Sequence, residues 1–176
     1  MEATELQDIV SAIIANRRHN SLRPHELVDA IHRRRFPGNY FPILAPLLEI
    51  KNGVTYKYAI DIVGKLKNPP AAASDAIESA WESSWEHDVP QACSEAFRAL
   101  IRIGGNDVRL LRMINKSMTV DNYDIHKECA LALMKIEQGR EILENWSDTT
   151  AGRCNCHLHK KLAKKICDHL KTDNQS

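Results

Sequence analysis

A short pattern of small and bulky residues recurs three times along the chain and constrains its fold most. The clearest copy is CSEAFRAL at residues 93–100, and an echo, CALALMKI, follows thirty-six residues later at 129–136. A fainter copy, AIDIVGKL, begins at residue 59, thirty-four residues before the first. Spacings of three and four put the small and bulky residues of each copy on one helical face. A period of this length is typical of a helix–turn–helix unit in a stacked helical array.

Hydrophobic periodicity predicts helices along nearly the whole chain, with only seven Gly and seven Pro to interrupt them. The repeat pattern predicts helices over residues 91–104 and 125–139. We expect further helices over residues 5–15, 24–35, 43–50, 55–67, 74–86, 107–117, 140–146 and 158–170. Ser74 and Asp75 are expected to cap one of them, and residues 147–153 to form a polar linker. The inward residues expected on the helices 107–117 and 158–170 are Val108, Leu111, Ile114, Leu158, Leu162, Ile166 and Leu170. No segment shows a convincing strand pattern.

The repeat spacing and the Gly or Pro breaks resemble the HEAT and armadillo class of helical repeats, best over residues 55–146. The resemblance implies an all-α fold, a short right-handed α-α superhelix of about eight to nine helices. We expect a single all-helical domain over residues 1–176. Residues 1–53 would form divergent N-terminal helices, 54–146 the HEAT-like repeats and 154–171 a C-terminal capping helix. Unequal repeat lengths and the lack of a regular Asp and Arg ladder set the chain apart from long HEAT arrays.

The composition favours a globular protein of the cytoplasm. Hydrophobic residues make up 43% and charged residues 27% of the 176 residues, which is too apolar for a disordered chain. No apolar run approaches the roughly 18 residues of a membrane span, and the N-terminus lacks the basic and apolar regions of a secretory signal. Five cysteines without an export signal argue against a disulfide framework. Cys93 and Cys129 are expected to be buried, unreactive thiols.

The net charge of +1 hides an acidic middle. Residues 69–150 carry eight Lys or Arg against fourteen Asp or Glu, whereas residues 1–68 carry ten against seven and residues 151–176 six against two. Helical spacing groups the acidic residues into stripes, of which one comprises Glu137, Glu141, Glu144 and Asp148. The residues predicted to bind a partner are Asp75, Glu78, Glu82, Trp85, Glu86, Asp88, Asp121, Asp124 and Glu128. A negative surface of this kind attracts basic partners and speeds their association.

Each of these features also has a purely structural explanation. A stripe of carboxylates is often a solvated helix face. Trp81 and Trp85 lie one turn apart and continue a stripe from Ile77, which favours core packing between repeats. The alternative for Trp85 is a partly exposed anchor, because tryptophan is enriched among interface hot spots.

The C-terminal tail holds the only cluster that resembles a metal site, formed by Cys154, Cys156, His157 and His159, with Cys167 and His169 further on. Its spacing lacks the two separated ligand pairs that are usual in zinc sites. Cys167 and His169 are two residues apart on a predicted helix and therefore point in different directions. We therefore expect a tail of free thiols, with no metal and no cofactor.

Three short basic patches invite a nucleic-acid interpretation: residues 17–19, residues 32–35, and Lys160, Lys161, Lys164 and Lys165. They lie at opposite ends of the chain and lack interleaved aromatic residues, and an acidic middle would repel phosphate. Solvated helix ends are the simpler explanation, and the sequence also argues against a membrane partner.

No catalytic motif is found, neither a Gly-rich phosphate loop nor a metalloprotease or serine-hydrolase signature, so we expect no catalytic residues. The main hypothesis is a non-catalytic protein-binding module. It is similar in type to the immunity proteins that neutralise bacterial toxins, many of which are basic nucleases. One alternative is an enzyme, because HEAT-like DNA glycosylases resemble this architecture and Asp75 or Glu78 near Trp81 could supply their carboxylate and aromatic groups. Another is a repeat adaptor within a larger assembly.

Overall fold

The chain is all-α in the residues that the structure describes. This computed structural model describes residues 1–19, 28, 30–51, 53–86, 90–104, 107–119, 122–136, 138–153 and 157–173. Within these ranges the sole β-type pairing is an isolated bridge between Pro37 and Lys67. The predicted all-α class is confirmed.

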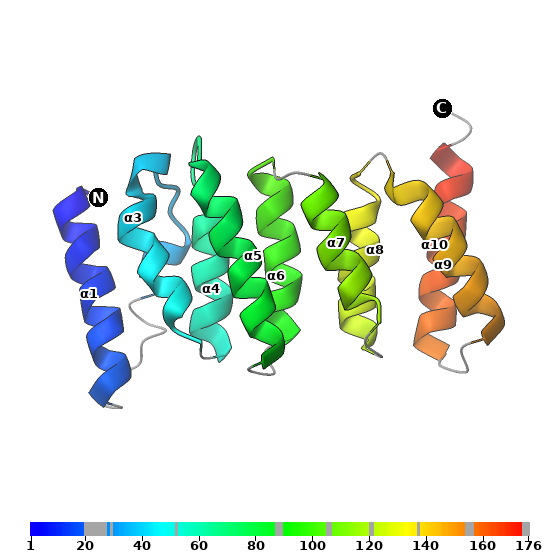
Figure 1. The fold of residues 1–176 in the computed structure, drawn as a ribbon, viewed down its shortest axis with the longest axis horizontal. Coiled ribbons are helices and arrows are strands. Elements are labelled where there is room, and N and C mark those ends of the chain that lie inside the picture. The colour runs from blue at the N-terminus through cyan, green and yellow to red at the C-terminus, as the bar shows by residue number, and fades with distance from the viewer. Residues whose placement is uncertain are drawn as a thin grey trace. The chain divides into compact units, whose positions relative to one another are not determined.

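Internal contacts divide the chain into two compact units, residues 1–106 and 107–176. The first contains α1 (Ala3–His19), η1 (Gly38–Tyr40), α3 (Phe41–Leu44), η2 (Ala45–Glu49), α4 (Gly53–Val63), α5 (Ala71–Glu86) and α6 (Pro90–Arg102), where η marks a 3-10 helix. The second contains α7 (Asp107–Ser117), α8 (Tyr123–Leu133), α9 (Gly139–Arg153) and α10 (His157–Asp173). Figure 1 labels these elements. The right-handed superhelix and the single domain over residues 1–176 stay predictions.

The recurring pattern marks the buried faces of alternate helices. Its three copies lie on α4, α6 and α8. The copy on α6 lies within the helix, whereas the copies on α4 and α8 extend into the turn that follows each helix. Every pattern residue is buried: Ala59, Ile62, Val63, Leu66, Cys93, Ala96, Phe97, Leu100, Cys129, Ala132, Leu133 and Ile136. Helical periodicity therefore identified the core correctly, because each of these faces packs against neighbouring helices.

In the first unit α4 and α6 lie side by side and α5 covers them (Figure 1). The two helices approach closely at Gly64, where an added Cβ would lie 2.4 Å from the Cβ of Ala99. Only a residue without a side chain allows this approach. The hydroxyl of Tyr56 on α4 donates a hydrogen bond to the carbonyl oxygen of Ala80 on α5, at 2.6 Å. The small residues of the pattern thus let the three helices share one core.

Several predicted helix boundaries are wrong. α1 continues to His19 rather than ending at residue 15, α4 ends at Val63 rather than residue 67, and α8 ends at Leu133 rather than residue 139. α9 continues to Arg153, so the segment 147–153, which was predicted to be a polar linker, is helical. α5 begins at Ala71, before the expected cap at Ser74 and Asp75. Three alanines at the start of α5 favour the helical conformation, so the helix begins directly after the Pro69-Pro70 pair. The second predicted helix, from residue 24, begins outside the described residues.

Two residues expected to point inward are exposed instead. The exposed fraction of Val108 is 72%, and that of Leu158 is 47%. The buried face of α7 is formed by Leu110, Met113 and Ile114, which shifts it by roughly 100° around the helix, about one residue, from the predicted stripe. Both exposed residues lie in the first turn of their helix, where a side chain can extend past the end of the neighbouring helix.

The cysteines in the described part of the chain are free thiols. Cys93 and Cys129 are buried, as expected, and Cys167 is partly exposed. Burial raises the pKa of the Cys93 thiol to about 11, although a hydrogen bond with Ser84 partly offsets this effect. Such a thiol is almost entirely protonated at neutral pH and is a poor nucleophile. Among the described helices, none combines the length and apolar character needed to cross a membrane.

The close approach at Gly64 predicts a measurable effect of one added methyl group. Gly64→Ala should lower the free energy of unfolding by about 1–3 kcal/mol, because the new Cβ collides with Ala99. Urea denaturation would measure this loss. In the double variant G64A/A99G the loss should be smaller than the sum of the two single losses, because the variant removes one colliding atom. Ser79→Ala, on the exposed side of α5, serves as a control that should leave stability nearly unchanged. Additive losses in the double variant would contradict the predicted contact.

Candidate functional site

The inner face of α5 fixes this helix firmly to the core of the first unit. Ile77 and Trp81 are fully or almost fully buried, with exposed fractions of 0% and 2%. Ser84 is also buried, and its hydroxyl donates to the carbonyl oxygen of Trp81 and contacts the sulfur of Cys93 on α6 at 2.9 Å. Because hydrogen bonds and packing hold α5 on both α4 and α6, its outer face is presented in a defined orientation.

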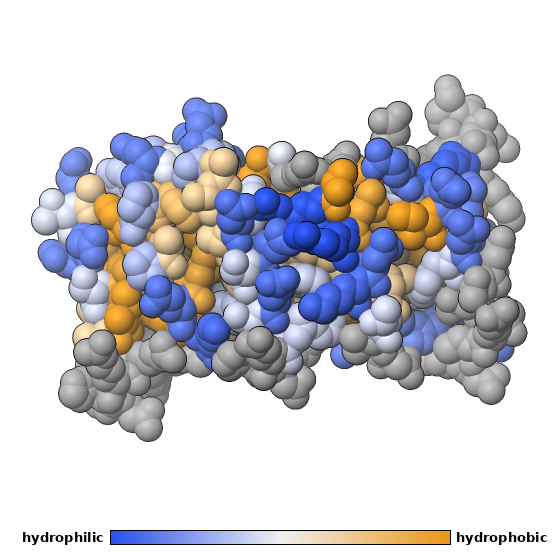
Figure 2. All heavy atoms as spheres, viewed as in Figure 1, coloured by the Kyte–Doolittle hydropathy of each residue, from blue (hydrophilic) through white to orange (hydrophobic). Residues whose placement is uncertain are grey.

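The outer face of α5 is acidic. Asp75 and Glu82 are exposed and Glu78 is partly exposed, at the spacing of three and four that was predicted. The helix Ala71–Glu86 contains no Lys, Arg or His. Figure 2 shows hydrophilic side chains over the middle and C-terminal part of α5, whereas hydrophobic side chains gather over α1 and α3. We call Asp75, Glu78 and Glu82 the acidic face of α5.

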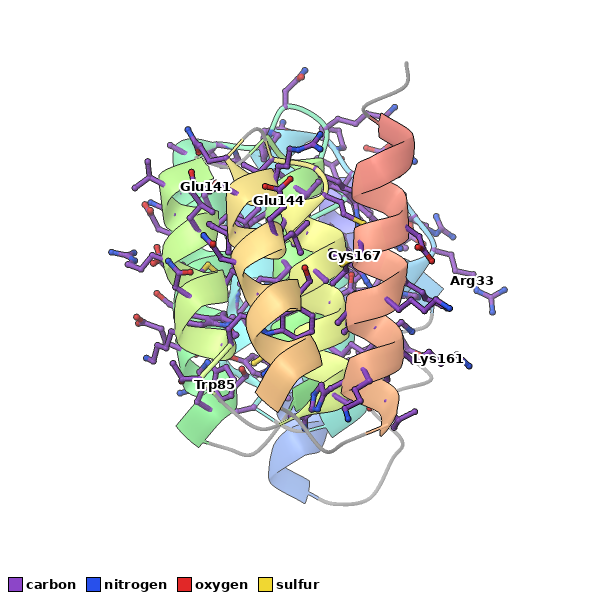
Figure 3. All side chains as sticks on the ribbon, turned by 90° about the vertical axis from the view of Figure 1, so that its right-hand side faces the viewer. Arg33, Trp85, Glu141, Glu144, Lys161 and Cys167 are labelled. Atoms are coloured by element: carbon purple, nitrogen blue, oxygen red, sulfur yellow. The ribbon has the colours of Figure 1, made fainter. Side chains whose placement is uncertain are left out.

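Trp85 lies at the C-terminal end of this face (Figure 3). Its ring is partly exposed and meets the ring of Trp81 edge-on, with centroids 6.1 Å apart. The Nε1 atom of Trp85 is buried and has no hydrogen-bond acceptor in the described part of the chain. Trp81 is a core residue, as its position next to Ile77 suggested. Its ring is not exposed, so Trp81 cannot stack on a base as a glycosylase would require.

The structure brings only some of the predicted residues together. Glu86 ends α5, but its side chain lies outside the described part of the structure, as do Asp88 and Asp121. Asp124 is exposed and Glu128 partly exposed on α8, in the second unit. These two residues lie one turn apart on α8.

The stripe predicted near Trp146 differs from the acidic face of α5 because it includes a cation. Glu141 and Glu144 are exposed on α9 (Figure 3). The Nε of Arg140 donates to a carboxylate oxygen of Glu144 at 3.1 Å. Glu137 and the side chain of Asp148 lie outside the described residues. Such an exposed pair contributes only a few tenths of a kcal/mol and is typical of a solvated helix face.

A buried cluster of charges joins α4 to α6, and the sequence did not single it out. The guanidinium of Arg102 donates to Asp61 at 2.5 Å and to Glu95 at 2.6 Å, so one cation bridges two carboxylates. Asp61 is further paired with Lys65, one turn away, and with the Nε2 of His32 at 2.6 Å. The side chains of Asp61 and Glu95 are 8% and 6% exposed, and that of Arg102 is 35% exposed. The cluster thus places its carboxylates inside and its cations towards solvent.

The two carboxyl groups of the cluster have opposite pKa shifts. Burial alone would raise the pKa of Asp61, but hydrogen bonds from Lys65 and Arg102 and the charges of both hold it below its ordinary value. Burial and the negative charge of Asp61 raise the pKa of Glu95, and Arg102 only partly offsets them. Such divergence occurs at acid–base sites and in structural ion networks. Here the nearly complete burial of both carboxylates and their shared guanidinium favour a structural role, fixing α6 against α4.

A signal for this cluster was present in the sequence. Asp61 interrupts the apolar run from residue 59 to residue 63, and Lys65 follows it at the spacing of an ion pair on a helix. A charged residue in a buried helical face requires a partner. The partner Arg102 lies forty-one residues away, and only the packing of α4 on α6 brings it into contact.

The predicted metal-like cluster is described only in part. Cys154 and Cys156 lie outside the described residues, as does the side chain of His157. His159 is 4% exposed, and its Nε2 shares a hydrogen bond with the Nδ1 of His126 on α8, at 3.0 Å. The ring of His159 therefore helps to hold α10 on α8. Among the described residues no group of three or more His, Cys, Asp or Glu is arranged to hold a metal ion.

Comparison of the chain with models of protein families, with curated proteins and with solved structures gave no match.

Removing the bridging cation should destabilise the protein. Arg102→Gln leaves two nearly buried carboxylates without their shared partner and should cost about 3 kcal/mol, the lower end of the range for breaking a buried ion pair, because Arg102 itself is partly exposed. The free energy of unfolding of Arg102→Lys should lie between those of Arg102→Gln and the wild type, because a lysine keeps the charge but cannot bridge both carboxylates. Urea denaturation would measure these differences.

Arg98→Gln is the matched control for this experiment. Arg98 is 47% exposed and approaches Glu95 only at 3.5 Å, so its loss should cost less than about 1 kcal/mol. Equal losses in the two glutamine variants would show that Arg102 does not have the bridging role assigned to it.

The raised pKa of Glu95 predicts a pH dependence of stability. The native state holds the proton of Glu95 more tightly than the unfolded chain does, so this group favours folding below its ordinary pKa of 4.5. That contribution is lost as the pH rises through the raised native pKa. The free energy of unfolding of the wild type, relative to Glu95→Gln, should therefore fall when the pH is raised from 4.5 to 7. Denaturation of both proteins across this range would measure the difference, and a constant difference would contradict the assignment.

Proposed function

We propose that the protein is a non-catalytic binding module and that the acidic face of α5 binds a basic protein. The observation that carries the proposal is a rigidly held helix with exposed carboxylates and no cation of its own. A surface of one sign attracts an oppositely charged partner and raises its association rate. Trp85 would act as an anchor, because its partly exposed ring can be buried by a partner.

Repulsion within α5 opposes part of its charge pattern. Carboxylates near the C-terminal end of a helix face the negative end of its dipole, and Glu82 lies within the last turns of α5. Carboxylates three and four residues apart also repel each other, by about 0.2–0.5 kcal/mol per pair. Both effects oppose folding, and a basic partner would reverse both.

Within this class we propose a HEAT-like helical repeat protein that acts as an immunity protein. Three pattern copies on alternate helices support the repeat architecture. A toxin with nuclease activity carries a basic surface for nucleic-acid phosphates, and the carboxylates of α5 could occupy the positions of those phosphates. The proposed site of action is the cytoplasm, where such a toxin would meet its substrate.

The proposal predicts a salt-sensitive interaction that depends on α5. The probe is the purified product of a neighbouring reading frame that encodes a basic protein, and its binding would be measured by calorimetry at rising salt. E78K/E82K should weaken the affinity at least about tenfold, about 1.4 kcal/mol, because it replaces attraction with repulsion. Trp85→Ala should also weaken it, but without changing the salt dependence, because it removes contact area rather than charge.

The matched control is E5K/D8K on α1, which changes the net charge equally at two exposed residues far from α5 in the sequence. It should leave the affinity almost unchanged. Binding that ignores salt, or that falls equally in both double variants, would exclude the acidic face of α5 as the binding surface.

A further inference from the structure

The exposed side of α10 gathers four lysines. Lys160, Lys161, Lys164 and Lys165 are all exposed, and Figure 3 shows Lys161 pointing away from the neighbouring helices. The opposite side of α10 is buried and comprises His159, Leu162, Ala163 and Ile166. The four lysines thus form one continuous stripe, which we call the lysine face of α10.

An open, shallow hollow borders this face. The hollow has a volume of about 560 Å³, and it is lined by the four lysines together with Asp168. Within the part of the chain that the structure describes, none of the four lysines forms an ion pair. Among the described residues of this lining, four lysines outnumber one carboxylate, which gives the surface there a positive potential.

The placement of these charges opposes the stability of the helix. Lys160 lies in the first turn of α10, at the positive end of the helix dipole, and no acidic residue of that turn offsets its charge. Lys160 and Lys164, like Lys161 and Lys165, are one turn apart and repel each other. A bound anion would remove both unfavourable effects.

We propose that the lysine face of α10 binds the phosphate backbone of a nucleic-acid strand without reading its sequence. A lysine ammonium binds phosphate as a point charge, and neutralising several phosphates releases condensed counterions. The face contains no aromatic side chain to stack on bases, so it contacts the backbone alone. This inference is independent of the function proposed for α5, because it concerns other residues, on a helix of the second unit.

Two other anionic partners fit the face less well. An amphipathic helix binds a membrane by burying its apolar side in lipid, but the apolar side of α10 is already buried in the protein. Leu158, at 47% exposed, is the apolar residue of the described part of α10 that remains accessible to lipid. Protein interfaces are depleted in lysine and use aromatic or arginine anchors, which this face lacks. A strand of phosphates requires only the repeated positive charges that are present.

The test uses the full chain and a short fluorescently labelled single-stranded DNA of mixed sequence, with binding measured by anisotropy. Affinity should fall with salt with a log–log slope of about −2 to −3, the value for three or four neutralised phosphates on a single strand. K161E/K165E should weaken binding at least about tenfold, and K161Q/K165Q should weaken it less, because it removes the attraction without adding repulsion. A change of DNA sequence should have little effect.

The matched control is R35E/K67E, which changes the net charge equally at two exposed residues of the first unit. Circular dichroism and thermal melting of each variant show that its fold is intact. The proposal is overturned if the DNA does not bind at about 50 mM salt or if both glutamate variants weaken binding equally. It is also overturned if the chain binds anionic phosphatidylserine vesicles, or polyglutamate, more tightly than the DNA. Loss of DNA binding in K161E/K165E with retained binding to a basic protein would support the lysine face and leave the role of α5 intact.

Discussion

The arrangement of the first unit depends on one guanidinium between two buried carboxylates. Arg102 on α6 bridges Asp61 of α4 and Glu95 of its own helix, so α6 can pack in one register against α4. In that register Gly64 meets Ala99, and the two helices form a common surface that α5 covers. The orientation of the acidic face therefore follows from a contact between α4 and α6. Buried charges of this kind contribute little net stability, but a wrong register would leave them unpaired, which is costly.

Hydrophobic periodicity predicted the core residues correctly but not the ends of the helices. The three pattern copies identify buried residues on α4, α6 and α8, because burial repeats with the helical turn and survives small errors in boundaries. The limits of α5 and α9 were wrong because local residues decide where a helix stops, and Ser147 to Arg153 look like a linker only by polarity. Val108 and Leu158 fit the helical spacing, yet they lie in first turns, where neighbouring helices no longer cover them.

The acidic face could be predicted from the sequence, whereas the partners in the buried cluster could not. Asp75, Glu78 and Glu82 are a local pattern on one helix, so their shared exposure could be predicted from spacing. The contact of Arg102 with Asp61 spans forty-one residues and depends on how two helices pack. Sequence spacing shows that Asp61 needs a partner but not which residue supplies it. The pairing of His126 with His159, thirty-three residues apart, was missed for the same reason.

The charges of α5 and α10 share an arrangement that suggests why the chain keeps them. α5 has no cation and carries a carboxylate near its C-terminal end, and α10 carries Lys160 in its first turn, so both oppose the dipole of their helix. A sequence optimised for folding alone would place these charges the other way round. Each helix is nevertheless held, α5 by Tyr56, Ser84 and its buried tryptophan, and α10 by His159 and its apolar side. Tertiary packing thus tolerates charge repulsion within each helix, and a partner of opposite charge would relieve that repulsion.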